Sequence, residues 1–191
     1  MNTEQNLFQG ENFNRIQVLE KIIKDKEFFN CAFVSCNFFE HKFENCEFEK
    51  CSFESCDLSL ASFKNSRLLD TIFKNSKIIG VNWSLCKSPA NYDFYNCKLD
   101  NGSFMGQSLT GMKIINCSAK EVDFTETDLS KAELQKTDFL KSRFFNTNLS
   151  YADFSEALNY SINPTMNKLK KTIFTLPEAI NLLDSFNVVI K

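Results

Sequence analysis

The residues of this chain with the greatest capacity for chemistry are its cysteines. Eight occur in 191 residues, and five of them (Cys31, Cys36, Cys46, Cys51 and Cys56) are separated by multiples of five. A zinc site needs four ligands that converge on one point, usually supplied by CxxC pairs, and the sequence has no such pair. The spacing favours cysteines packed inside a regular repeat. We therefore predict no metal site and no cofactor.

His41 is the single histidine, and catalysis by its imidazole would need a nucleophile or a carboxylate within hydrogen-bond reach. Aspartates recur directly before apolar residues, as solvated turn residues do: Asp57, Asp93, Asp123, Asp128, Asp138 and Asp153. The chain has only 5 glycines and no glycine-rich phosphate loop. We predict a packed structural histidine, no catalytic residues and no enzymatic activity.

A repeat of five residues must position all of these side chains. Every fifth residue is apolar from Phe8 to Trp83 and, after one inserted residue, from Phe94 to Phe154, which makes 29 such centres. A period of five matches neither a helix nor a flat strand, and it indicates a solenoid that turns a corner in each unit. The residue two before each centre is mostly small, which predicts that both point inward. The other three positions are mainly polar and should face solvent.

Stretches such as CEFEKCSFESCDLSLASF (residues 46–63) and TDLSKAELQKTDF (residues 127–139) resemble the pentapeptide-repeat family, whose motif is roughly A(D/N)LXX. The resemblance covers about residues 8–160. It implies an all-β fold, a right-handed quadrilateral parallel β-helix with four pentapeptides per coil. The 29 centres at four per coil then make about seven coils, in which residues 20 apart are stacked.

Two segments depart from the motif. Lys21 and Lys26 occupy inner positions near the N-terminus, where unpaired charges are costly, so residues 14–27 are either an irregular first coil or a short amphipathic helix. Residues 84–93 contain the inserted residue and Pro89, which cannot donate to a ladder, and they predict a small bulge or corner loop.

The C-terminal sequence TLPEAINLLDSFNVVIK (residues 175–191) predicts a capping helix at about 176–185. Thr175 and Glu178 have the spacing of a capping box, and Pro177 fits a first helical turn. The ending also resembles that of Qnr-type pentapeptide proteins, in which a C-terminal element joins two rods end to end. We expect a homodimer through the following residues: Leu182, Leu183, Phe186, Val188 and Ile190.

The predicted organisation has three parts: an irregular first coil or cap (1–27), a repeat domain with a break at 84–93 (28–160), and a last coil with capping helix and dimerisation tail (161–191). No run approaches 18 apolar residues, and the N-terminus lacks an apolar signal core, so we expect no membrane association and a cytoplasmic location. The net charge of -2 gives no reason to expect direct nucleic-acid binding.

Apolar residues at outer positions predict a contact surface. Leu19, Phe39 and Ile79 fall in one stacked column, with Phe29 on what we expect to be an adjacent face and Leu60 beside the column. The alternative is that the N-terminal segment folds over this column.

Two functions fit these features. The first is a scaffold that binds an unidentified protein through its apolar face. The second is implied by the Qnr-type resemblance. It is a bacterial rod-shaped protein that mimics DNA, binds DNA gyrase or topoisomerase IV and lowers quinolone susceptibility. Mixed charges on the outer faces and the lack of long loops favour the first.

Overall fold

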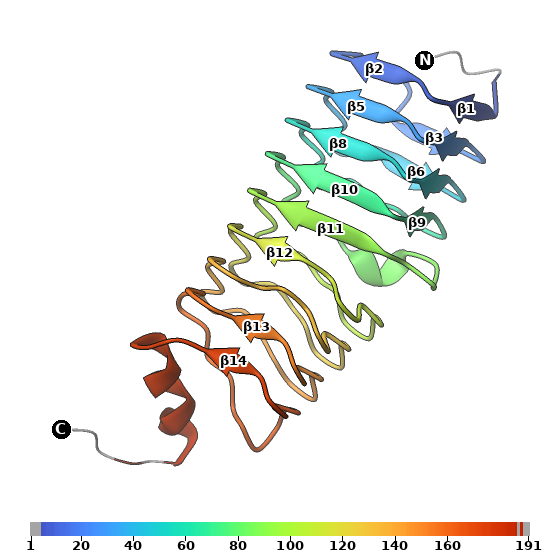
Figure 1. Cartoon of the computed structure of the whole chain (residues 1–191). Helices are drawn as coiled ribbons and strands as arrows, with labels where there is room; N and C mark the ends of the chain where they lie inside the picture. The colour runs from blue at the N-terminus through green and yellow to red at the C-terminus, as the bar shows by residue number, and fades with distance from the viewer. Residues whose placement is uncertain (1–4, 187, 189–191) are drawn as a thin grey trace.

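The computed structural model describes residues 5–186 and 188. The chain winds into a parallel β-solenoid of about eight turns, one more than the count of centres predicts, with a helix at its C-terminal end (Figure 1). The strands are short because each pentapeptide ends in a corner, where a residue such as Asn30 or Asn45 has a φ of 53° or 55°. Asparagine, aspartate and glycine tolerate this left-handed conformation best, which explains their frequency at the corners.

Four faces surround the core, and we number them in chain order. Face 1 begins with β1 (Leu7–Gln9), β4 (Glu27–Phe29), β7 (Glu47–Glu49) and β9 (Arg67–Leu69). Face 2 has the longest sheet, with these strands: β2 (Asn12–Asn14), β5 (Ala32–Val34), β8 (Ser52–Glu54), β10 (Thr71–Lys74), β11 (Tyr92–Tyr95) and β12 (Ile114–Ile115). β13 (Asp153–Phe154) and β14 (Ile173–Phe174) continue face 2 towards the C-terminus (Figure 1).

Face 3 is held by single parallel bridges, such as Gln17 to Asn37 and Asn37 to Asp57. Face 4 begins with β3 (Ile22–Lys24) and β6 (Lys42–Glu44) and continues through bridges of the same kind. All pairs before the break join residues 20 apart, for example Phe33 with Phe53. The predicted stacking register is therefore confirmed.

The centres form continuous apolar columns inside the rod. Phe53 is fully buried, and its ring stacks on Phe33 with centroids 4.6 Å apart and on Phe73 with centroids 5.0 Å apart. Neighbouring columns meet edge to face, as Phe28 and Phe33 do at 5.4 Å. These are the arrangements that the quadrupole of an aromatic ring prefers.

The first coil is more regular than the sequence predicted. Residues 14–27 contain β3 and the start of β4, and they include no helix. Lys26 does point inward and is 8% exposed, but its ammonium donates a hydrogen bond of 2.8 Å to Oδ1 of Asn6. The charge is tolerated because Asn6, which holds the same inner position one coil earlier, is its polar partner.

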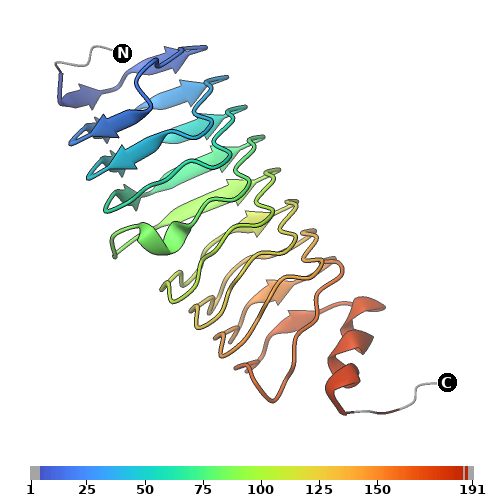
Figure 2. The ribbon, with the colours of Figure 1, turned by 180° about the vertical axis from the view of Figure 1, so that it is seen from behind.

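The break at 84–93 is a corner loop, as expected. It begins with the 3₁₀ turn η1 (Trp83–Leu85), capped by the side chain of Asn82, and it contains a cis Ser88–Pro89 bond. Pairs that span the loop are 21 residues apart, as Phe73 and Phe94 are, and beyond it the separation returns to 20, as in Phe94 with Ile114. Tyr92 occupies an inner position that is usually small, and its buried ring stacks on Trp83 with centroids 4.9 Å apart. Figure 2 shows the turn on the side of the rod.

The C-terminal end carries the 3₁₀ helix η2 (Glu178–Phe186), close to the predicted range of 176–185. The capping box is not formed, because the hydroxyl of Thr175 accepts a hydrogen bond of 2.9 Å from the amide of Glu156 instead. No residue of η2 is fully buried, and Leu182 packs only partly against the core. Within the described residues no helix is long and apolar enough to cross a membrane.

Candidate functional site

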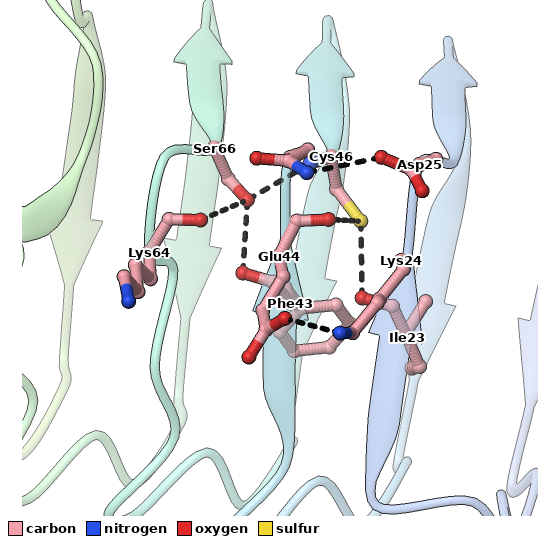
Figure 3. A network of polar contacts seen from close by, with 9 residues as sticks. Ile23, Lys24, Asp25, Phe43, Glu44, Cys46, Lys64 and Ser66 are labelled. Carbon is pink, nitrogen blue, oxygen red and sulfur yellow. Dashed lines mark hydrogen bonds and ion pairs between the residues drawn. The ribbon is translucent and has the colours of Figure 1, made fainter.

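The inner cysteines, serines and threonines form a ladder of hydrogen bonds to the backbone. Most of them contact the carbonyl of the centre 23 residues earlier, whereas Cys97 and Cys117 contact the carbonyl two residues earlier. Cys46 Sγ lies 3.5 Å from the oxygen of Ile23, and Ser66 Oγ donates to the oxygen of Phe43 over 2.9 Å (Figure 3). Ser66 Oγ also accepts a bond from the amide of Cys46. The sequence predicted small packed residues here, and the hydrogen-bonding role went beyond that prediction.

The thiols are buried within this ladder. Burial raises the pKa of the thiol of Cys46 to about 11 and that of Cys51 to about 12. The loop cysteine, Cys86, is also buried, and burial raises its pKa to about 12. The thiols of Cys46, Cys51 and Cys86 thus stay protonated at neutral pH and are neither good nucleophiles nor metal ligands. A hydrogen bond with Cys56 lowers the pKa of Cys36, and one with Cys117 lowers that of Cys97. In the described part of the chain no three His, Cys, Asp or Glu residues cluster as metal ligands would.

His41 takes the place of a cysteine in the same ladder. It is 3% exposed, with Nδ1 lying 3.1 Å from the oxygen of Phe39 and Nε2 lying 3.1 Å from the oxygen of Val18. Both contacts are to backbone carbonyls. The ring therefore ties the first coil to the second, and neither ring nitrogen is directed at a nucleophile or a carboxylate.

The aspartates before the centres hold the turns. Asp128 Oδ1 accepts from the amide of Ser130 over 2.9 Å, and Asp153 Oδ1 accepts from that of Ser155 over 2.8 Å. Asn37 makes the same contact with Phe39, which explains why the motif accepts either Asp or Asn. Asp93 differs, because its Oδ1 accepts from the amide of Lys113 on the next coil, and burial raises its pKa. No two of these carboxylates are arranged for acid–base chemistry.

Part of the predicted apolar surface lies together on face 3, and we call this part the Phe39 patch: Leu19, Phe39, Leu60 and Ile79. Leu19 is 88% exposed, so the described part of the N-terminal segment does not cover it. Phe39 is 38% exposed, with the ammonium of Lys21 5.6 Å from its ring centroid. Leu19 and Phe39 line a shallow hollow together with Gln17, Lys21 and Asn37.

Leu60 lies over the backbone at Gly80, where an added Cβ would come within 2.7 Å of its Cδ2. Gly80 also has a φ of 72°, so a larger residue there would both strain the corner and displace Leu60. Leu60, which is 53% exposed, thus continues the patch towards the half-buried Ile79. Ser59, between the Phe39 and Ile79 rows, is buried and interrupts the column.

Phe29 does not belong to this patch. It lies in β4 on face 1, whereas Phe39 follows two pentapeptides later on face 3. Four pentapeptides complete a coil, so a separation of ten residues reaches the opposite face, and the expectation of an adjacent face was wrong. Phe29 instead lines a separate hollow with Leu7, Glu27 and Glu49, and the ammonium of Lys50 lies 5.2 Å from its ring centroid.

The predicted dimerisation residues gather at the C-terminal end of the rod. Leu183, Phe186 and Val188 are 42%, 52% and 54% exposed, and Leu182 is half buried. Ile180 adds another exposed apolar side chain on η2. Ile190 lies outside the described residues. The exposed residues leave an apolar surface beyond what closes the last coil.

The sequence matches two models of one family. "Pentapeptide repeat region" matches residues 26–90, and "Pentapeptide repeats (8 copies)" matches residues 113–144 and 123–158. The chain belongs to the pentapeptide-repeat family. The matched ranges contain most of the inner ladder and the left-handed corners described above.

Solved pentapeptide-repeat proteins share this fold. A trypsin-treated variant of QnrB1, a plasmid-mediated fluoroquinolone resistance protein, aligns over 97% of both chains with a TM-score of 0.74 and 18% identity. Full-length QnrB1 covers 95% of this chain and 97% of its own, with a TM-score of 0.58 and 17% identity. HetL of Nostoc sp. strain PCC 7120 covers 87% and 82%, with a TM-score of 0.46 and 13% identity. No curated protein sequence matches.

The inside of this rod is filled by the stacked apolar columns and the hydrogen-bonded ladder. His41 and most of the inner cysteines, serines and threonines hydrogen-bond to the backbone, and the outer faces carry the side chains that a partner can reach. The apolar outer residues were predictable from the sequence, but the ladder was missed, since most of its donors contact carbonyls 23 residues away. The recurrence of Cys, Ser and Thr at the inner position was the signal for it.

Proposed function

We propose that this pentapeptide-repeat protein is a non-enzymatic scaffold of the bacterial cytoplasm that binds a protein partner through the Phe39 patch. The observation that supports this most strongly is the exposure of Leu19, Phe39 and Leu60 on one face of a rod whose reactive groups are engaged internally. Exposed apolar residues grouped on a rigid surface are more typical of contact sites than scattered ones are.

The test compares proteins captured from a bacterial lysate by three forms of the chain: the wild type, Phe39→Asp and Leu140→Asp. Leu140 is a matched control, because it is 42% exposed and holds the same position of the repeat on the same face, several coils away. We expect a partner that Phe39→Asp loses and Leu140→Asp retains, with little dependence on salt. A partner retained by Phe39→Asp contradicts a role for the patch.

A second candidate is a Qnr-like modulator that mimics DNA and binds DNA gyrase or topoisomerase IV. The likeness to QnrB1 over nearly the whole of both chains favours it. The outer charges weigh against it, because acidic residues are paired with neighbouring cations, as in Arg67–Glu47 at 3.3 Å and Lys113–Glu133 at 2.8 Å. A carboxylate stripe that imitates phosphates would be left open towards its partner.

A gyrase supercoiling assay in the presence of a quinolone separates these candidates. We expect weak protection or none. Strong protection at sub-micromolar protein, abolished by moderate salt and unaffected by Phe39→Asp, would favour the gyrase-binding function.

We also propose that two rods associate end to end through η2 and the following tail, because Leu183, Phe186 and Val188 remain exposed in the single chain. Such a contact would be isologous. Light scattering of the intact protein at micromolar concentration should give the mass of a dimer, and deletion of residues 176–191 should give a monomer or an aggregate. A monomeric intact protein would contradict the proposal.

A further inference from the structure

Towards the C-terminal end of the rod lie four lysines that form no ion pair among the described residues. We call Lys131, Lys168, Lys170 and Lys171 the lysine patch. All four are on face 1 or at its corner, towards the C-terminal end of the rod, and all four are exposed. Between Glu156 and Glu178 the sequence has three lysines and no Asp or Glu.

Elsewhere in the rod the stacking register determines how charges pair. Lys24 and Glu44 lie 20 residues apart and form an ion pair of 2.9 Å (Figure 3). Arg67–Glu47 and Lys113–Glu133 have the same separation. Because a residue lies beside the one 20 positions away, most of the ion pairs found join a cation to an acid in that row, and Lys50–Glu49 and Lys120–Asp138 are the exceptions among the described residues.

The lysine patch does not follow this rule. The residues 20 positions before Lys168, Lys170 and Lys171 are Asn148, Ser150 and Tyr151. The ammonium groups of Lys170 and Lys171 lie 6.0 Å and 5.9 Å from the centroid of the Tyr151 ring. None of the ion pairs found among the described residues includes a lysine of this patch.

Asp128, a carboxylate on this face, is already engaged in hydrogen bonds. Asp128 Oδ1 accepts hydrogen bonds from the amide of Ser130 and from Nδ2 of Asn148. Burial by itself would raise the pKa of Asp128, but these hydrogen bonds and the charge of Lys168 together lower it. The positive field of the patch therefore extends along face 1, where it is only partly neutralised.

We propose that the lysine patch binds a short acidic segment of another protein. The four ammonium groups lie within three successive coils, with Tyr151 at the corner between Lys131 and Lys171. Positive charge is therefore presented over a short length, since neighbouring coils are ~4.8 Å apart. A long polyanion such as a nucleic acid fits less well. Continued along face 1, it would reach Glu27, Glu47 and Glu49, which would repel it.

This surface is separate from the Phe39 patch, which lies on the opposite face near the other end of the rod. The two surfaces differ in chemistry as well as in position. The inference therefore does not depend on the proposed function, and each can fail without the other.

The test uses the intact protein and a fluorescein-labelled peptide of alternating Glu and Ser, with binding followed by fluorescence anisotropy. We expect saturable binding that weakens about tenfold or more when salt rises from about 50 to 300 mM, because exposed charges are screened over this range. The double variant Lys170→Glu/Lys171→Glu should weaken binding about tenfold or more, and Lys170→Gln/Lys171→Gln should weaken it less.

A matched control, Lys64→Glu/Lys74→Glu, reverses the charge of two lysines outside the patch. It changes the net charge of the protein by the same amount as Lys170→Glu/Lys171→Glu does. Both are exposed and belong to no ion pair among the described residues. It should change affinity by less than about twofold, as expected of charges distant from a bound segment. Equal weakening by both double reversals, an affinity unchanged by Lys170→Glu/Lys171→Glu, or no binding by the wild type would overturn the proposal. So would equally tight binding of a single-stranded oligonucleotide that is lost in the same variant.

Discussion

Buried hydroxyl groups are accommodated differently in the regular coils and at two breaks in the repeat. One break is the loop at residues 84–93, and the other lies near Tyr160, where Phe144 pairs with Ile162, 18 residues away. In the regular coils, Thr137 Oγ1 donates to the oxygen of Ile114 over 2.8 Å and accepts from the amide of Cys117 over 3.2 Å. Near the breaks, the hydroxyls of Tyr92 and Tyr160 are buried without a hydrogen-bond partner among the described residues. A regular coil brings a carbonyl to each inner hydroxyl, whereas a break does not.

Both tyrosines fill the core with their rings. Tyr92 stacks on Trp83 beside the loop, where Ala90 is the only loop residue between Lys87 and Asn91 that packs partly on the core. Tyr160 packs against Phe154 and Phe174 with centroids 5.6 Å and 5.4 Å away. Burial raises the pKa of Tyr160 to about 12, with a smaller contribution from Glu178. Where the repeat is interrupted, filling the core outweighs the hydrogen bonding of one hydroxyl.

The largest expected effect comes from emptying a regular column. Phe53→Ala should lower the free energy of unfolding by roughly 3–5 kcal/mol, because the ring is fully buried between Phe33 and Phe73. The exposed neighbour Glu54→Ala should change it by less than about 0.5 kcal/mol. Chemical denaturation measures both, and equal losses would contradict the inward and outward assignments.

Removal of a partnered hydroxyl should have the next largest effect. Thr137→Val keeps the shape of the side chain but leaves the carbonyl of Ile114 without its donor and the amide of Cys117 without its acceptor. We expect a loss of roughly 1–3 kcal/mol in the free energy of unfolding. A neutral result would mean that the ladder adds nothing beyond packing.

Removal of an unpartnered hydroxyl provides the opposite case. Tyr92→Phe keeps the ring that stacks on Trp83 and deletes an oxygen that has no partner among the described residues. The free energy of unfolding should stay the same or rise by up to about 1 kcal/mol, since no hydrogen bond is lost. If Tyr92→Phe is as destabilising as Thr137→Val, the distinction between coils and breaks does not hold.

The smallest effect at neutral pH is expected at a turn. Asp128→Asn retains an oxygen that can accept from the amide of Ser130, so stability at pH 7 should change by less than about 0.5 kcal/mol. The pKa of Asp128 is lowered in the folded protein, so its contribution is present above the usual value and is lost as pH falls below it. Denaturation curves between about pH 5 and pH 2 should therefore fall less steeply for Asp128→Asn than for the wild type.

Much of the fold was predictable because one rule is repeated many times. The period of five identified Phe33, Phe53 and Phe73 as one stacked column, and the single inserted residue predicted the loop before Phe94. The role of Tyr92 was not predictable, because its inner position elsewhere holds a small residue.

The candidate surface was predictable in part. Leu19 and Phe39 directly follow apolar centres, and this position correctly predicted that they lie outside. Phe29 was assigned to the wrong face, because a separation of ten residues was taken to reach an adjacent face rather than the opposite one. The partner of Lys26 was also missed. Its inner position suggested an irregular coil, and only the structure reveals that Asn6 lies within hydrogen-bond distance of its ammonium.

The change of register at residues 84–91 has a consequence for engineering. Phe73 and Phe94 remain paired even though the coil between them is one residue longer than the coil between Phe53 and Phe73. The extra residue in this corner therefore leaves the stacking of the centres unchanged. Foreign sequence such as a peptide tag or a whole domain could be inserted near Pro89, where the chain is exposed. The rod itself can be lengthened only by whole coils, in steps of ~4.8 Å. An engineered version could therefore hold an inserted domain at the loop while its length is set by the number of coils.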